Sequence, residues 1–287
     1  MNPLVKWAGG KRQLLPRIMK CLPDSWNTYY EPFSGGLALL VEMYNRGKVN
    51  KAVIGDANPE LMNLYSTVKN FPTDLVNAIS EFGFSNDPAC YYEIRNKFNS
   101  LIGDQYRSAE RAAMFLYLNR HCFNGLWRVN SDGRFNVPFG KYSNPSLPTE
   151  GHIFRFSQML KQTRIVTGDF SEVTGSARKG DFVYFDPPYF PLSRSSSFTY
   201  YAQRGFGFSD QIRLRDLCRE LDRNGIRFLL SNSSSKEMME LFGEFRIKRV
   251  SVNRFINSVA EKRTGHHEIL VTNYSVETGG QEEHESE

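Results

Sequence analysis

The chain has 287 residues, 40% of them hydrophobic, which is enough for one large domain or two modest ones with a well-formed core. No run of 18 apolar residues occurs and the first 11 residues lack the apolar core of a signal peptide, so we expect a cytoplasmic, nucleoid-associated protein that binds no membrane. The net charge is +5, and it is +10 without the five glutamates of the last twelve residues, which favours a polyanionic partner.

Short apolar or β-branched runs recur along the chain and end in Gly, Asp, Asn or Pro, which is typical of buried parallel strands. In chain order these predicted strands are 28–31, 52–55, 165–167, 182–185 and 227–230. The predicted helices between them are 11–20, 37–45, 59–69 and 210–223. This alternation predicts an α/β sheet that binds ligands at the carboxyl ends of its strands.

The middle of the chain breaks this rhythm. Residues 72–147 are mostly helical and then rich in turns, and 109–120 is the clearest helix, with apolar residues for one buried side. We therefore expect a helical insertion over 60–148 within a catalytic domain made of 1–59 and 149–275. Two late runs, 247–252 and 268–274, predict a closing antiparallel pair, and the acidic residues 276–287 predict a disordered tail.

The four cysteines, Cys21, Cys90, Cys122 and Cys218, are scattered and form no CxxC pair. We therefore expect neither a disulfide framework nor a metal site. None of them follows a proline, which argues against methylation of cytosine C5, a reaction that uses a cysteine nucleophile.

Asp186-Pro187-Pro188-Tyr189 directly follows the predicted strand 182–185. Two successive prolines remove two backbone donors and stiffen the chain. The carbonyl groups and Asp186 can then accept both hydrogens of an exocyclic amino group while Tyr189 stacks on its base. Accepting these hydrogens orients the nitrogen lone pair toward a methyl donor. The motif favours an amino-methyltransferase over an ordinary Pro-Pro turn.

A glycine-rich turn containing Phe33 and Gly35 follows the predicted strand 28–31 and would let the backbone approach a nucleoside cofactor closely. Asp56 ends the next strand about twenty residues later, where an acid can accept hydrogen bonds from both ribose hydroxyls. Asp169 and Phe170, after the third strand, could hold the adenine of the cofactor, although Asp169 could equally cap a helix.

The segment 119–142 is rich in Asn, Gly, Arg and aromatic residues. Arg128 can bind guanine O6 and N7, whereas asparagines such as Asn130 suit adenine. Phe123, Leu126 and Trp127 are candidate wedges between bases, and Lys141 and Tyr142 suit phosphates. Each of these residues could instead belong to a packed surface loop.

Five motifs together make the chain resemble the DNA adenine methylase (Dam) family of D12-class N6-adenine-specific methyltransferases. They are KWAGGK at 6–11, YEPFSGG at 30–36, FLYLNR at 115–120, FNVPFGKY at 135–142 and YFDPPY at 184–189. The resemblance runs from Lys6 to about Tyr274. It implies a Rossmann-like methyltransferase sheet with a helical target-recognition insertion, S-adenosylmethionine as methyl donor and a duplex GATC target.

The resemblance also implies residue roles. Trp7, Lys11, Asp56 and Asp186 match cofactor positions, and Asp186, Pro187 and Tyr189 match the group that holds the target adenine. The DNA-contacting positions it implies are Lys6, Phe123, Asn124, Leu126, Arg128 and Tyr142. Two departures stand out: Leu37 occupies the place of the last glycine in FxGxG, and Phe123 stands where a tyrosine is also found.

These observations predict an enzyme that flips adenine out of the duplex and methylates N6 by direct displacement. We expect a monomer that needs no metal. Three alternatives remain at this point: methylation of cytosine N4, a DNA-binding protein that has lost catalysis, and methylation of RNA or protein. The intact Asp186–Tyr189 motif argues against loss of catalysis, and the match through the recognition segment argues against RNA or protein.

Overall fold

A computed structural model describes residues 1–7, 9, 11, 13–101, 108–190, 206–252 and 266–276. The chain forms two compact units. The first comprises 1–12 and 28–176, and the second comprises 13–27 and 177–287. Within the described residues, no helix combines the length and the apolar character needed to cross a membrane.

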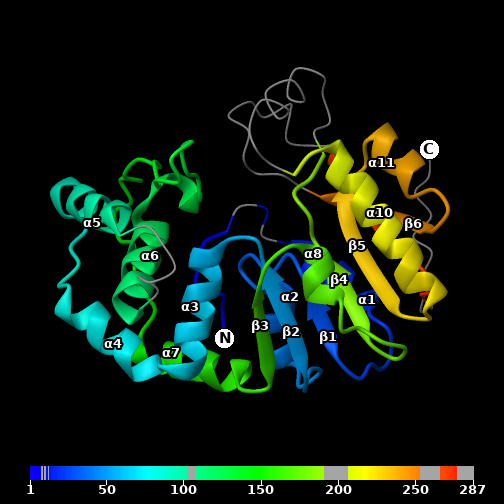
Figure 1. Cartoon of the computed structure of the whole chain (residues 1–287), viewed down its shortest axis with the longest axis horizontal. Coiled ribbons are helices and arrows are strands. Elements are labelled where there is room, and N and C mark those ends of the chain that lie inside the picture. Colours follow the sequence, from blue (N-terminus) through cyan, green and yellow to red (C-terminus); the bar gives the residue numbers. More distant parts are fainter. Residues whose placement is uncertain are drawn as a thin grey trace. The chain divides into compact units, whose positions relative to one another are not determined.

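The first unit contains three parallel strands in the order β3-β2-β1 (Figure 1). They are β1 (Tyr29–Glu31), β2 (Ala52–Asp56) and β3 (Thr163–Thr167). The helices that follow them are α2 (Ala38–Asn45), α3 (Pro59–Asn70) and α8 (Phe170–Thr174). β1 and β2 pair from Tyr29 opposite Ala52, so the ends of the strands lie at the same edge. The three predicted strands of this unit are confirmed.

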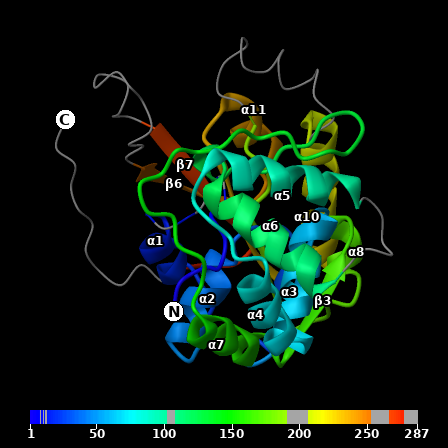
Figure 2. The ribbon, with the colours of Figure 1, turned by 90° about the vertical axis from the view of Figure 1, so that its left-hand side faces the viewer.

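The remaining helices of the first unit are α4 (Pro72–Glu81), α5 (Pro88–Ser100), α6 (Ala109–His121) and α7 (Glu150–Leu160). Figure 2 shows α6 among α3, α4 and α5, all three of which it contacts. The predicted helix 109–120 is confirmed, but the expectation of one buried side is wrong. Every residue from Arg111 to Asn119 is buried, because neighbouring helices cover α6 on several sides.

A buried ion pair joins α6 to α3. The Arg111 guanidinium donates to both carboxylate oxygens of Glu60, over 2.8 and 2.7 Å. It also donates to the carbonyls of Phe98 and Leu101, and it lies 4.0 Å from the centre of the Phe98 ring. Arg111 is 3% exposed, so these acceptors replace the water that the charge loses on burial.

The described part of the second unit contains four strands in the order β4-β5-β7-β6. They are β4 (Phe182–Phe185), β5 (Arg227–Ser233), β6 (Arg246–Val252) and β7 (His266–Thr272). β4 and β5 are parallel, whereas β7 is antiparallel to both β5 and β6, which confirms the predicted closing pair. Among the described residues of this unit, the helices are α1 (Leu15–Lys20), α10 (Phe208–Arg223) and α11 (Lys236–Leu241).

All four cysteines are free thiols. Cys21, Cys122 and Cys218 are buried, whereas Cys90 is partly exposed. Burial raises the pKa of all three buried thiols, that of Cys122 to about 12. These side chains therefore pack as small hydrophobic groups.

Candidate active site

In the first unit, the candidate residues begin with the turn between β1 and α2. The Ser34 amide donates to the Gly55 carbonyl over 2.9 Å, which fastens the turn to β2. Gly35 has φ +41°, and a Cβ atom there would lie 2.6 Å from Cδ1 of Trp7. Glycine is therefore required at this position by its backbone conformation and by the indole that packs against it.

Leu37, the departure from the glycine pattern, adopts the conformation that glycine favours. Its φ and ψ are 58° and 35°, in the left-handed region, and it is the residue before α2. This conformation costs a residue with a Cβ atom about 1–2 kcal/mol. The Leu37 side chain is 0% exposed, and burial of a leucine stabilises by about 1.5–3 kcal/mol, which offsets that cost.

Asp56 lies at the end of β2, beside the glycine turn. Its Oδ2 accepts from the Gly35 amide over 3.1 Å, and its Oδ1 accepts from the Asn58 amide over 3.0 Å. Burial raises the pKa of Asp56, and these two backbone donors counteract part of that rise. The cap of α3 is Asn58, whose side chain accepts from the amides of Glu60 and Leu61. Asp56 is thus not needed as the cap and can accept hydroxyl groups.

Tyr65, which sequence reasoning did not select, supports the same turn from α3. Its hydroxyl donates to the Gly35 carbonyl over 2.6 Å, and its side chain is fully buried. Burial and the nearby carboxylates of Asp56 and Glu31 raise its pKa well above the usual value. Within the sequence, Tyr65 looks like one more apolar residue of an amphipathic helix, so only its partner thirty residues away reveals its role.

Five other predicted cofactor residues also lie in this unit. Trp7 packs over Gly35 and Gly36, and the Lys11 ammonium, largely buried, donates to the Gly9 carbonyl over 3.1 Å. Phe170 is buried and stacks on Phe33 with 5.4 Å between ring centres. Asp169 caps α8, because its Oδ1 accepts from the Ser171 amide over 3.1 Å.

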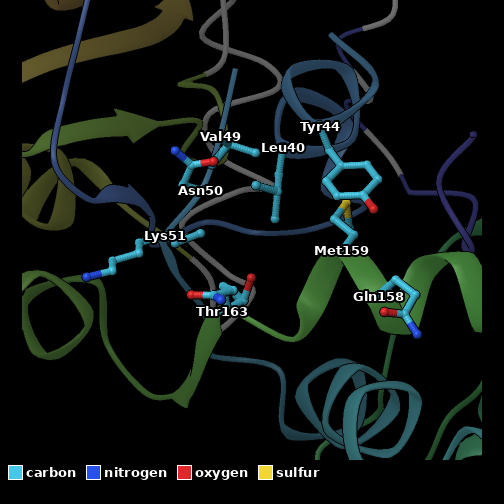
Figure 3. A pocket seen from close by; sticks show the side chains of 10 residues that line it. Leu40, Tyr44, Val49, Asn50, Lys51, Gln158, Met159 and Thr163 are labelled. Carbon is cyan, nitrogen blue, oxygen red and sulfur yellow. The ribbon is translucent and has the colours of Figure 1, made fainter. Parts of the chain in front are cut away.

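The pocket in Figure 3 lies elsewhere in the first unit. It has a volume of about 340 Å³, and its lining includes Ala52 and Thr163, the first residues of β2 and β3. Among the predicted cofactor residues, Asp56 is the last residue of β2, and Asp169 and Phe170 come after the last residue of β3. This pocket therefore does not coincide with the predicted cofactor site.

In the second unit, the candidate residues are those of the Asp186–Tyr189 segment after β4. The Ser231 hydroxyl, from β5, donates to Oδ1 of Asp186 over 3.0 Å. A hydroxyl has one hydrogen, so the Tyr184 hydroxyl, 3.1 Å from Ser231 Oγ, is the donor in that contact. Tyr184, Ser231 and Asp186 therefore form a chain of hydrogen bonds that fixes one carboxylate oxygen.

Tyr189 is held at its hydroxyl. It donates to Oε2 of Glu268, a buried residue of β7, over 2.6 Å. Burial and the charges of Asp186 and Glu268 raise its pKa well above the usual value, so the phenol stays protonated. Fixing the hydroxyl sets the orientation of the ring, which a stacking role requires.

Ser231 and Glu268 were not selected from the sequence. A signal was nevertheless present, because each is a polar residue next to an apolar run: Ser231 follows FLL at 228–230, and Glu268 precedes ILV at 269–271. Both are buried, and buried polar groups in strands need partners.

The segment after α6 carries the predicted DNA-contacting residues. Phe123 is 50% exposed and Asn124 has φ 54°, so this short turn (Phe123–Gly125) projects an aromatic ring into solvent. Trp127 instead packs between Phe98, Phe115 and Phe135, with ring centres 5.9, 4.6 and 4.8 Å away. Trp127 is partly exposed, and these contacts hold its ring within the unit, so its role as a wedge stays a prediction.

Residues 128–136 form a small hairpin. The Arg128 guanidinium is exposed, and its Nε donates to the Asn136 side chain over 2.7 Å. Asn130 closes the turn, since its Oδ1 accepts from the amides of Asp132 and Arg134. Oδ1 of Asn130 is thus engaged within the turn, and a two-point contact of the Asn130 amide with adenine would need the same oxygen.

Lys6 and Tyr142 lie together in this unit. The Lys6 ammonium is 3.8 Å from the centre of the Tyr142 ring. Burial together with the charge of Arg120 lowers the pKa of Lys6. Gly125 must be small, because a Cβ atom there would lie 2.4 Å from that of Lys6. Leu126 is partly exposed, and Lys141 is exposed with φ 52°.

Among the described residues, no cluster of His, Cys, Asp and Glu side chains could hold a metal ion. The candidate residues supply hydrogen-bond acceptors at two strand ends, aromatic rings and exposed cations. They suit the binding of a nucleoside cofactor and the orientation of an amino group, with no step that requires a nucleophilic side chain.

A family model described as D12 class N6 adenine-specific DNA methyltransferase matches residues 7–256. The type II methyltransferase M1.LlaDCHI of Lactococcus lactis subsp. cremoris is 42% identical over 276 residues, 96% of each chain. M.MjaIII of Methanocaldococcus jannaschii is 40% identical over 288 residues, covering 96% of this chain and 99% of its own. The DNA adenine methylase of Haemophilus influenzae is 35% identical over 273 residues, covering 94% and 92%.

The family match confirms the predicted fold class, a Rossmann-like methyltransferase with a mixed and mostly parallel sheet. It also confirms the predicted methyl donor, S-adenosylmethionine. The chain therefore belongs to the D12 class of N6 adenine-specific DNA methyltransferases.

Proposed function

We propose that this adenine methyltransferase acts on GATC in duplex DNA and flips the adenine out of the helix before methyl transfer. Flipping is required because N6 is paired and stacked within a duplex. The observation that carries the proposal is the Asp186–Tyr189 segment, whose carboxylate and ring are each held by a buried partner. A fixed acceptor and a fixed ring suit an extruded base.

Within this proposal, Asp186 and the Pro187 carbonyl accept the two N6 hydrogens, and Tyr189 stacks on the adenine. S-adenosylmethionine supplies an electrophilic methyl group. In the first unit, Asp56 accepts its ribose hydroxyls, Lys11 binds its carboxylate, and Trp7, Phe33 and Gly35 shape the surface around it. Asp169 and Phe170 bind its adenine, and Asp186 contributes a further cofactor contact.

GATC as the target is supported by the Dam resemblance through the recognition segment. Arg128 is exposed on a hairpin, as a reader of guanine must be, and its guanidinium is oriented by Asn136. Phe123 and Asn124 contact the space left by the flipped base, and Leu126 is a second reader within the site. Lys6 contacts the first base pair, Asn130 contacts a base, and Lys141 and Tyr142 contact the backbone. We assign residues 60–148 as the target-recognition insertion, 1–59 with 149–275 as the catalytic domain, and 276–287 as a tail, in a cytoplasmic, nucleoid-associated monomer.

The experiment is methyl transfer from labelled S-adenosylmethionine to two duplexes of equal length. One contains GATC, and the other replaces it with GTTC paired to GAAC, so that adenines remain in both strands. We expect label in the GATC duplex alone, released as N6-methyladenine after digestion to nucleosides. Label in both duplexes would remove the sequence specificity, and label in neither would remove the proposed function.

Asp56 leads to a prediction about cofactor affinity. Substitution of Asp56 with Asn removes charged hydrogen bonds worth about 1.5–3 kcal/mol, so the Kd for S-adenosylmethionine should rise roughly 10- to 100-fold. The raised pKa of Asp56 also means that its charge is lost at a higher pH than for an ordinary aspartate. Wild-type affinity should therefore weaken as the pH falls, beginning above the usual range of aspartate.

Calorimetric titration of both proteins between pH 8 and pH 5 checks this prediction. The Asp56→Asn protein has no carboxylate at this position and should show the flatter profile. Parallel profiles for the two proteins would show that Asp56 is not the group responsible.

A further inference from the structure

One of the two proline carbonyls in the Asp186–Tyr189 segment is already occupied. The Pro188 carbonyl accepts a hydrogen bond from Nε2 of Gln211 over 3.0 Å. Gln211 lies in the first turn of α10, and its side chain is 0% exposed. A buried amide without partners is costly, so this contact is a fixed part of the folded unit.

Asn232 determines which way the Gln211 amide points. Nδ2 of Asn232 donates to Oε1 of Gln211 over 3.0 Å, and Asn232 is itself 0% exposed. The Asn232 amide is oriented in turn, because its Oδ1 accepts from the Ser233 amide over 2.8 Å. If Gln211 were flipped, two donors would face each other at Asn232 and two acceptors at Pro188. This chain of hydrogen bonds therefore has one favourable orientation.

These hydrogen bonds distinguish the Pro187 carbonyl from the Pro188 carbonyl. Within the described part of the protein, no donor is found for the Pro187 carbonyl, whereas the Pro188 carbonyl has Gln211. Gln211 also ties the segment to α10. Because the ring of Pro188 fixes its φ, the peptide that carries the Pro187 carbonyl cannot rotate without moving Pro188 and breaking this part-buried hydrogen bond. Orientation of acceptors before the substrate arrives lowers the barrier of a positioning-dependent reaction.

We propose that Gln211, oriented by Asn232, is a positioning residue that holds the Pro188 carbonyl and thereby presents the Pro187 carbonyl to the adenine amino group. The inference rests on the proposed role of the Asp186–Tyr189 segment. Gln211 does not touch the substrate in this account. It acts through the backbone, and it should affect the rate of methyl transfer more than the binding of DNA or cofactor.

The test compares Gln211→Met, which keeps the length of the side chain and removes both polar contacts, with Leu214→Ala. Leu214 is 0% exposed and lies one turn further along the same face of α10. Truncation of a buried leucine costs about 2–5 kcal/mol, so this control perturbs packing without touching the amide chain. Single-turnover rates are measured with saturating cofactor and GATC duplex, well below the melting temperatures of both variants.

We expect the rate of Gln211→Met to fall on the order of 10²-fold, as for a misplaced reacting group, with Kd values for DNA and cofactor within about threefold of wild type. Leu214→Ala should keep the wild-type rate. A wild-type rate in Gln211→Met, or an equal loss in Leu214→Ala, would overturn the inference alone. Absence of transfer by the wild-type protein would overturn the proposed function, and the inference with it.

Gln211→Glu provides a second readout. A neutral carboxyl group can donate to the Pro188 carbonyl and accept from Asn232, as the amide does, whereas a carboxylate cannot donate. Burial favours the neutral form, so its rate relative to wild type should recover as the pH is lowered from 8 toward 6. A purely structural role predicts a relative rate that does not change with pH in this direction, and such a result would overturn the inference.

Discussion

Replacement of Asp186 with Ala should reduce methyl transfer roughly 10²- to 10³-fold, while DNA binding stays close to that of the wild type. The variant removes the acceptor that orients the amino nitrogen, and loss of one oriented group of this kind typically costs 10²–10³-fold in rate. It also leaves the Ser231 hydroxyl without the carboxylate to which it donates. The exposed residues proposed to contact DNA lie in the other unit and are unchanged.

The measurement pairs single-turnover transfer with the anisotropy of a labelled GATC duplex. Asp186→Asn is the matched variant, because it keeps a carbonyl acceptor and loses only the charge, so its rate should lie between those of wild type and Asp186→Ala. An Asp186→Ala protein that loses DNA binding but still methylates would contradict the assigned role.

Breaking the buried ion pair of the first unit should have the largest effect on stability. Arg111→Met leaves Glu60 charged without its bidentate partner, and removal of one member of a buried pair costs about 3–5 kcal/mol. Glu60 is 18% exposed, so water screens part of its charge and we expect a loss of about 3 kcal/mol. Unfolding by urea, followed by a probe of the first unit, measures this change.

Two further measurements test whether the loss of stability comes from the ion pair itself. Substitution of both partners, Arg111→Met with Glu60→Leu, should destabilise less than the sum of the single changes, since neither charge is then left alone. The exposed pair Arg46–Glu42, with a 2.6 Å contact and 53% and 27% exposure, serves as the control and should contribute less than about 1 kcal/mol. Additive effects at Arg111 and Glu60 would show that the pair does not act as a unit.

The strands could be predicted from the sequence because buried parallel strands leave short apolar runs. β5 extends three residues beyond its predicted end, through Ser231, Asn232 and Ser233, all of which are buried. Their polarity suggested a loop, whereas their partners lie on β4, on α10 and within β5 itself. Contacts between distant segments therefore overrode the local pattern.

Helices were harder to place where their signals were short. α7, α8 and α11 were not predicted individually, although Thr149, Asp169 and Ser235 cap them through their side chains. A capping residue followed by only five or six helical residues, as in α8 and α11, resembles a turn.

Some residues of the candidate site could be predicted from the sequence, and others could not. The residues that touch cofactor or substrate in the proposal belong to recognisable sequence motifs. Glycine and proline are needed there for their backbone conformation, and aspartate is needed for its charge. The residues that hold them, Tyr65, Gln211 and Glu268, are ordinary in type. Their partners lie 30, 23 and 79 positions away in the sequence, and no local pattern connects them.

The reaction rates of the buried thiols can be used to measure how often each unit opens locally. The thiolate is the nucleophile that attacks thiol reagents, so Cys122 and Cys218, buried and with raised pKa values, should react only when their surroundings transiently separate. Cys122 belongs to the first unit and Cys218 to the second. With Cys21 and Cys90 replaced by serine and alanine, mass spectrometry of each labelled peptide would give two separate rates of exchange. A cofactor that stabilises one unit more than the other would then slow one rate and leave the other nearly unchanged.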